Sequence, residues 1–216
     1  MQNVYARDVN ITGGEVGTFS TMGINRNVYQ YGEIASSGAV ELNNMYSFKS
    51  GFLFEISKPH VEIKLFGGTH ITPWLRVPLI FSLSYMYDGL PKYEVHSNTI
   101  LPYVSYNGKW AGVSIGTSFR FTSFFKERAL FEPILSVSVY ANFVNNERLR
   151  VGLVSSNFNA FSAGNAGSYS LGVNSAVRIN EQLSIINEFE IKQSGSIGLS
   201  ANLYGIAWKG GFQFAW

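Results

Sequence analysis

The sequence predicts an all-β fold, an antiparallel transmembrane β-barrel of about 12 strands. Apolar residues alternate with glycine, serine and charged residues in many segments, as expected for strands that have one face in an apolar medium. Charged residues make up only 14% of the 216 residues, against about 25% in soluble domains. Short and long connections between the predicted strands also alternate, and no apolar run is long enough for a transmembrane helix.

The last predicted strand, residues 204–216, shows the alternation most clearly. At about 3.3 Å per residue it is about 40 Å long, enough to cross a bilayer when tilted. The residues between its apolar positions are small or polar. The apolar face contains Gly210 and the large residues Tyr204, Ile206, Trp208, Phe212, Phe214 and Trp216.

The ending Phe212-Gln213-Phe214-Ala215-Trp216 resembles the C-terminal signal of Gram-negative outer-membrane β-barrels. The resemblance implies a bacterial outer-membrane location, contact with membrane lipids and recognition by the outer-membrane assembly machinery. It also implies that the last strand closes the barrel against the first. The usual terminal residue is phenylalanine, so Trp216 departs from the pattern, and the segment identifies no individual family.

Further strands follow from the same alternation upstream. They are predicted at residues 75–87, 99–106, 110–121, 134–144, 148–157, 168–179 and 183–192. The connections between them alternate in length, as in outer-membrane barrels. The long ones are predicted at residues 88–98, 122–133, 158–167 and 193–203, and the short ones at 107–109, 145–147 and 180–182.

The N-terminal part is less regular. Residues 14–24 predict a weak first strand, in which Phe19 and Ser20 interrupt the alternation. The parity of the apolar positions changes between Ile56 and Val61, which requires a turn or bulge at residues 57–60.

The strand count follows from the room that this part offers. Residues 28–57 hold strands near 28–35, 39–48 and 52–57, or fewer and longer ones. Since bacterial single-chain barrels have an even number of strands, we expect 12, with 10 or 14 as alternatives. Residues 1–13 are predicted to be a tail or plug-like segment, and residues 14–216 the barrel.

Charged side chains are predicted to face the interior, because a charge on the lipid face costs about 2–4 kcal/mol at the midplane. They line an aqueous path or form a paired network that closes the lumen. The predicted pore-lining residues are Arg76, Arg120, Arg150, Arg178, Glu188, Glu190, Lys192 and Lys209, with Glu62 and Lys64 placed less firmly.

The favoured function is an outer-membrane channel for passive diffusion of small polar or anionic solutes, since a 12-stranded interior is too wide for side chains to fill. Anions are favoured because the predicted inward cations outnumber Glu188 and Glu190. The alternative is a closed-lumen barrel with a structural, adhesive or surface-binding role through its outer loops.

No catalytic or cofactor site is predicted. His60 and His70 are expected in turns, and His96 in a loop. His96 is adjacent to Ser97, so the two would point to opposite faces of a strand and could not act together. The chain has no cysteine and a net charge of only +2, which argues against thiolate metal sites and nucleic-acid binding.

Overall fold

The computed structural model describes residues 11–25, 30–43, 46–57, 60–71, 79–124, 128–157, 169–193 and 205–216. Within these ranges the chain forms 12 β-strands and a short 3-10 helix, η1, at Pro91–Tyr93. No helix of the described residues is long and apolar enough to cross a membrane. The strands are β1 (Ile11–Asn25), β2 (Gln30–Leu42), β3 (Tyr46–Ser57), β4 (His60–Ile71), β5 (Leu79–Leu90), β6 (Val95–Asn107), β7 (Ala111–Phe124), β8 (Arg128–Asn145), β9 (Leu149–Ser156), β10 (Tyr169–Arg178), β11 (Leu183–Gln193) and β12 (Gly205–Ala215).

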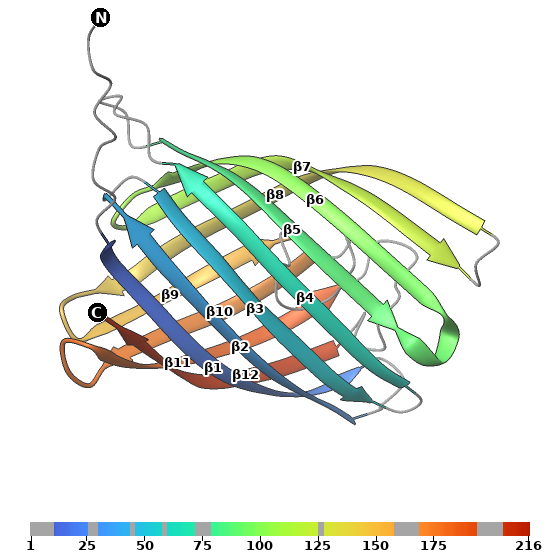
Figure 1. Ribbon diagram of the computed structural model, residues 1–216. Helices are drawn as coiled ribbons and strands as arrows, with labels where there is room; N and C mark the ends of the chain where they lie inside the picture. The colour runs from blue at the N-terminus through green and yellow to red at the C-terminus, as the bar shows by residue number, and fades with distance from the viewer. Residues whose placement is uncertain are drawn as a thin grey trace, which may run out of the picture.

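The strands form one closed antiparallel barrel, in which β1 pairs with β12 (Figure 1). Glu15 lies opposite Ala215 at one end of this seam, and Asn25 lies opposite Gly205 at the other. Beyond Glu15, Gly14 and Trp216 exchange two backbone hydrogen bonds of 3.0 and 3.1 Å. The predicted count of 12 strands and the predicted pairing of the last strand with the first are confirmed.

The outer face of the barrel is apolar, because alternate residues of each strand point outward. A water-facing surface with this much contiguous apolar area would be exceptional, whereas a lipid-facing barrel requires it. Eight strands contribute exposed examples, namely Ile34, Phe52, Leu83, Ile115, Leu153, Leu171, Ile191 and Trp208.

β1 explains the irregular alternation of the N-terminal part. It begins at Ile11, so residues 11–13 already belong to a strand; residues 1–10 lie outside the described part of the chain. Met22 is exposed on the outer face, whereas Phe19 lies on the inner face. A Cβ atom on Gly211 of β12 would lie 2.5 Å from the Phe19 ring. The ring thus occupies the space left by a glycine on the next strand, and the alternation is broken without any break in the strand.

Two predicted long loops prove to be mostly strand. β5 and β6 leave only Pro91 to Glu94 between them, and β7 and β8 extend to Phe124 and from Arg128. The expected loops at residues 88–98 and 122–133 are therefore wrong. Polar residues of these extensions, such as Asp88, face the barrel interior, so the alternation continues through them.

Pro133 lies within β8, although the strand was expected to begin after it. Proline is tolerated at a strand edge because it has no N–H to donate, and among the described residues β8 pairs with β9 only from Ser138 onward. Asn157 ends this ladder. Its backbone N–H donates to the Val137 carbonyl at 3.1 Å. Its side-chain oxygen accepts from Val137 N at 2.6 Å, and its side-chain amide donates to the Leu135 carbonyl at 2.8 Å.

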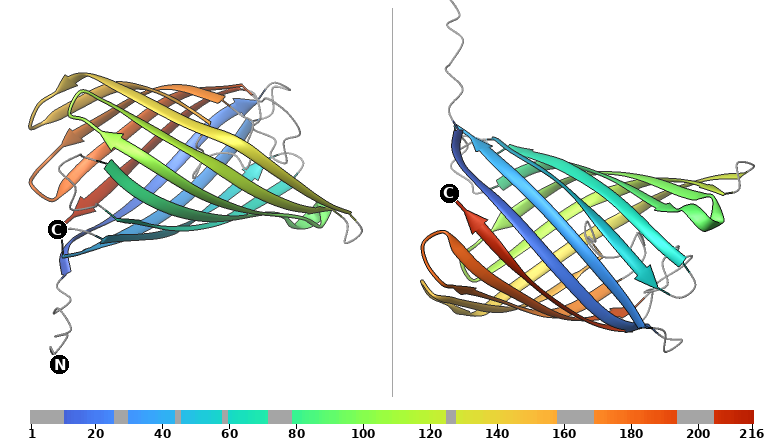
Figure 2. Two further views of the ribbon diagram at one scale, coloured as in Figure 1. Left: turned by 90° about the horizontal axis from the view of Figure 1, so that it is seen from above. Right: turned by 60° about the horizontal axis from the view of Figure 1, so that its bottom comes forward.

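The three predicted short turns are confirmed, and we call the end of the barrel that carries them the short-turn end. The side-chain oxygen of Asn146 accepts hydrogen bonds from Arg148 N and Leu149 N, and that of Asn180 accepts from Gln182 N and Leu183 N. The end of β12 and the start of β1 lie at this same end (Figure 2). The long connections predicted at residues 158–167 and 193–203 fall almost entirely outside the described residues, although Gln193 is the last residue of β11.

Candidate functional site in the barrel lumen

Most of the predicted pore-lining residues lie on the inner face, at positions that alternate with the exposed apolar residues. They are Arg120 on β7, Arg150 on β9, Arg178 on β10, Glu188 and Glu190 on β11, and Lys209 on β12. Arg76 lies outside the described residues, as do the side chains of Lys192, Glu62 and Lys64. The inner face is not uniform, because its charged groups differ in burial and pairing.

The short-turn end contains a cavity of about 520 Å³, which we call the mouth cavity. Its lining comes from the β6–β7 turn and from β8, β9 and β10, and includes Tyr140, Asn145, Arg150 and Asn174. Arg150 is exposed, and Arg178 is a diagonal neighbour on β10 that is also exposed. Neither arginine forms an ion pair within the described part of the chain, so both guanidinium groups are accessible to solvent and solutes.

Lys209 and Glu188 form an ion pair in the middle of the barrel. They lie opposite each other on β12 and β11, with Nζ and Oε2 3.6 Å apart. The Lys209 ammonium also lies 5.0 Å from the centroid of the Phe19 ring, a distance at which a cation is attracted to the ring face. The Lys209 side chain is therefore fixed by its contacts with Glu188 and Phe19 on the two neighbouring strands.

In the half of β5–β8 that lies away from the short-turn end, several polar side chains are buried together. We call this cluster the polar wall. Arg120 is 3% exposed and donates from Nε to Ser97 Oγ at 3.0 Å, and Thr122 Oγ1 lies 3.3 Å from the same oxygen. Ser118 and Ser136 are also buried, and their hydroxyl oxygens are 2.5 Å apart. Arg120 was predicted to line a pore, but its side chain has almost no contact with solvent.

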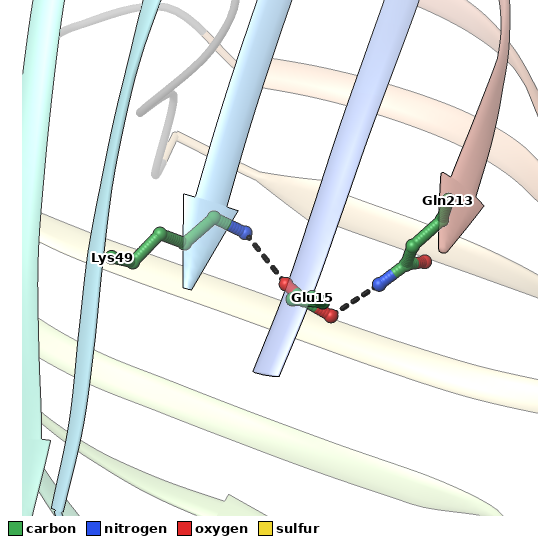
Figure 3. Close-up of polar contacts among 3 residues, drawn as sticks. All are labelled: Glu15, Lys49 and Gln213. Carbon is green, nitrogen blue, oxygen red and sulfur yellow. Dashed lines mark hydrogen bonds and ion pairs between the residues drawn. The ribbon is translucent and has the colours of Figure 1, made fainter. Parts of the chain in front are cut away.

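A second inner cluster crosses the seam of the barrel and was missed by the sequence analysis. Glu15 on β1 binds Gln213 on β12, and its other oxygen lies 3.4 Å from Lys49 Nζ on β3 (Figure 3). Lys49 reaches Glu15 over Ala39 of β2, which lies between them in register. Because these residues lie far apart in the sequence, the only available signal was their position on the polar face of each strand.

Among the inward side chains that the structure describes, acidic and basic groups are close to balanced once the N-terminal strands are included. The excess of cations predicted from the C-terminal part is not found in this described set. Inward acidic residues with described side chains are Glu15, Glu41, Asp88, Glu132, Glu188 and Glu190, and the basic ones are Lys49, Arg120, Arg150, Arg178 and Lys209.

The histidines lie on strands, contrary to the turns and loop predicted for them. His60 and His70 belong to β4 and His96 to β6. His96 faces outward, where its Nδ1 is 2.7 Å from the Tyr87 hydroxyl and the two rings stack. The described residues contain no group of three or more histidine, aspartate or glutamate side chains that could hold a metal ion.

No protein-family model and no curated protein matches the sequence. Solved structures do resemble the fold. An outer-membrane channel from Pseudomonas putida F1 has a TM-score of 0.57 at 8% identity, covering 100% of this chain and 99% of that one. The NanC porin has a TM-score of 0.56 at 9% identity, and the KdgM porin in complex with disordered oligogalacturonate has 0.56 at 8%. Each alignment covers 93% of this chain and 98% of the porin. The chain therefore has the fold of outer-membrane β-barrels.

Proposed function

We propose that this protein is a bacterial outer-membrane channel that allows passive diffusion of small polar or anionic solutes through its lumen. The observation that carries the proposal is the position of Arg150 and Arg178. Both face the interior at the short-turn end, both are exposed, and neither has a carboxylate partner in the described residues. In an outer-membrane barrel this end is periplasmic.

Anion preference follows from this position rather than from the number of charges. Lys209 and Lys49 are held against Glu188 and Glu15, so their fields are largely cancelled. Arg150 and Arg178 at one mouth have no such ion pair among the described residues. A wall of low dielectric constant concentrates such a field and raises the local concentration of anions.

The apolar outer face supports contact with membrane lipids, and the pairing of β12 with β1 is consistent with a last strand that the outer-membrane assembly machinery would deliver. The fold shared with porins supports passive transport over catalysis. The proposed transport needs no cofactor, since the charged side chains of the barrel wall would by themselves set which solutes pass.

The polar wall favours the alternative, a closed-lumen barrel with a structural, adhesive or surface-binding role. Asp88, Ser97, Arg120 and Ser136 are all buried, so this side of the interior is filled rather than open. Closure of this side alone would still allow a path along the remaining strands, whereas closure of the whole cross-section would prevent transport.

Planar bilayer recordings with purified, refolded protein would test the proposal. We expect stable, ohmic single-channel steps and a reversal potential on the anion side at low salt. Protein that is folded, as shown by heat-modifiable migration in gels, but electrically silent would overturn the channel and favour the closed barrel.

A further inference from the structure

We propose that the mouth cavity is a binding subsite for small hydroxylated carboxylates, that is, solutes with one carboxylate and adjacent hydroxyl groups. The inference deepens the proposed function and relies on it for the route by which the solute arrives. It depends on which hydrogen-bonding atoms the cavity leaves without partners.

Two basic residues, Arg150 and Lys109, line the cavity. The Lys109 Nζ lies 5.7 Å from the centroid of the Trp110 ring, whereas the Arg150 guanidinium is exposed and forms no ion pair with the described residues. Arginine presents N–H groups in a planar fork that fits a carboxylate with two parallel hydrogen bonds. This group selects an anion, but it does not by itself distinguish one carboxylate from another.

Asn174 supplies an acceptor on the neighbouring strand. Its side-chain oxygen is buried and has no hydrogen-bond partner. A buried acceptor without a donor is unfavourable, so a solute that brings a donor to this oxygen gains a bond that the wall does not supply.

Arg150 and Asn174 line the mouth cavity from adjacent strands. Gly152 of β9 lies opposite Asn142 of β8 on one side and Asn174 of β10 on the other. Arg150 lies opposite Ala176, so Arg150 and Asn174 are diagonal neighbours. A Cβ atom on Gly152 would be 2.5 Å from the Asn142 side-chain oxygen. The Asn142 side chain therefore occupies the space left by this glycine, and it lines the same cavity as Arg150 and Asn174.

Tyr140 and Asn145, which also line the cavity, donate hydrogen bonds to the β6–β7 turn. The Tyr140 hydroxyl donates to the Gly108 carbonyl at 2.8 Å, and the Asn145 amide donates to the Lys109 carbonyl at 2.5 Å. Their oxygens remain as acceptors. The lining therefore combines the cations Arg150 and Lys109 with several oxygen acceptors, which suits a solute that carries both a carboxylate and hydroxyl donors.

Three small molecules separate these requirements. Glycerate carries a carboxylate and two hydroxyl groups on three carbons, propionate keeps the carboxylate without hydroxyls, and glycerol keeps hydroxyls without charge. Saturation-transfer NMR titrations of the detergent-solubilised barrel at low salt would give their affinities. We expect glycerate to bind about tenfold more tightly than propionate, as one or two additional hydrogen bonds would give, and glycerol to bind more weakly than either.

Variants assign the two parts of the subsite. Asn174→Leu should reduce the preference for glycerate over propionate toward unity, and Arg150→Gln should weaken both carboxylates alike. Arg148→Gln is the matched control, because Arg148 carries the same charge at the same end but does not line the mouth cavity. Heat-modifiable migration would verify that each variant folds.

Equal affinities for glycerate and propionate in the wild-type protein would overturn the subsite, as would an Asn174→Leu variant with an unchanged preference. The binding assay does not require an open lumen, so the two proposals fail separately. A silent barrel that prefers glycerate keeps the subsite and loses the channel, whereas a conducting barrel without the preference keeps the channel and loses the subsite.

Discussion

Arg120 and Arg150 face the interior of the same barrel, on β7 and β9, but their surroundings differ. Arg120 is 3% exposed and bound to Ser97 within the polar wall. Arg150 is exposed and lines the mouth cavity without an ionic partner in the described chain. The first arginine belongs to the packing of the barrel, and the second is available to solutes.

The difference shows that an inward position does not make a residue pore-lining. A charge on the lipid face is unfavourable, so both arginines must face the interior. The alternation of apolar and polar residues indicates only this inward orientation. Whether a charge is then buried or solvated depends on the side chains of other strands. Stability should therefore depend on the polar wall, and selectivity on the mouth.

The largest expected effect comes from opening the barrel, since both regions require a closed ring. Phe214 of β12 and Trp216, which directly follows this strand, are exposed aromatic residues whose ring centroids are 6.2 Å apart. Replacing both by serine removes apolar area beside the β1–β12 seam, and we expect protein that fails to become heat-modifiable. The single change Phe143→Ser on β8 is the control, because Phe143 is a similarly exposed aromatic away from the seam. Equal loss of folding in the control would show that the seam is not special.

Arg120→Ala should have the next largest effect. It deletes a buried guanidinium and leaves the Ser97 oxygen without this donor, which we expect to cost about 3 kcal/mol of unfolding free energy. Urea unfolding in lipid vesicles would measure it. Arg178→Ala removes the same side chain from an exposed position and should cost less than about 0.5 kcal/mol. Similar losses for the two variants would contradict the distinction between the wall and the mouth.

Replacing Arg150 and Arg178 together by glutamine should change selectivity with little change in stability. We expect the reversal potential across a salt gradient to move toward cation preference. The shift should fade as salt rises, because the Debye length falls from about 10 Å at 0.1 M to about 3 Å at 1 M. A wild-type reversal potential already on the cation side at low salt would contradict the assignment of these arginines.

The smallest effect is expected for the Glu188–Lys209 pair, whose side chains are 28% and 23% exposed. Partly solvated pairs contribute about 0.5 kcal/mol. A double-mutant cycle of Glu188→Gln and Lys209→Gln in urea unfolding should give a coupling energy of that order. A coupling energy above about 2 kcal/mol would contradict this expectation and show that the pair contributes to stability as the buried polar wall does.

Sequence reasoning identified the faces of the strands because the period of two is local. The apolar face of residues 204–216 could be assigned from neighbouring residues alone, and so could the turns at residues 145–147 and 180–182. Pairing could not be predicted in this way. Glu15 meets Lys49 across 34 positions, and nothing in either local segment records the other. The sequence did not predict the ends of β5–β8 that lie opposite the short-turn end. Polar residues that face a buried interior are of the same types as those found in loops, so the two cannot be told apart by residue type.

The Glu15–Gln213 contact shown in Figure 3 also bears on the order of folding, because it joins residues 198 positions apart. Each hairpin can form between neighbouring segments, whereas this bond must wait until the two ends of the chain meet. It stabilises the ring but gives nothing to an open sheet. We expect changes at Glu15 to act mainly on the rate at which the ring opens, and to leave the formation of the hairpins almost untouched.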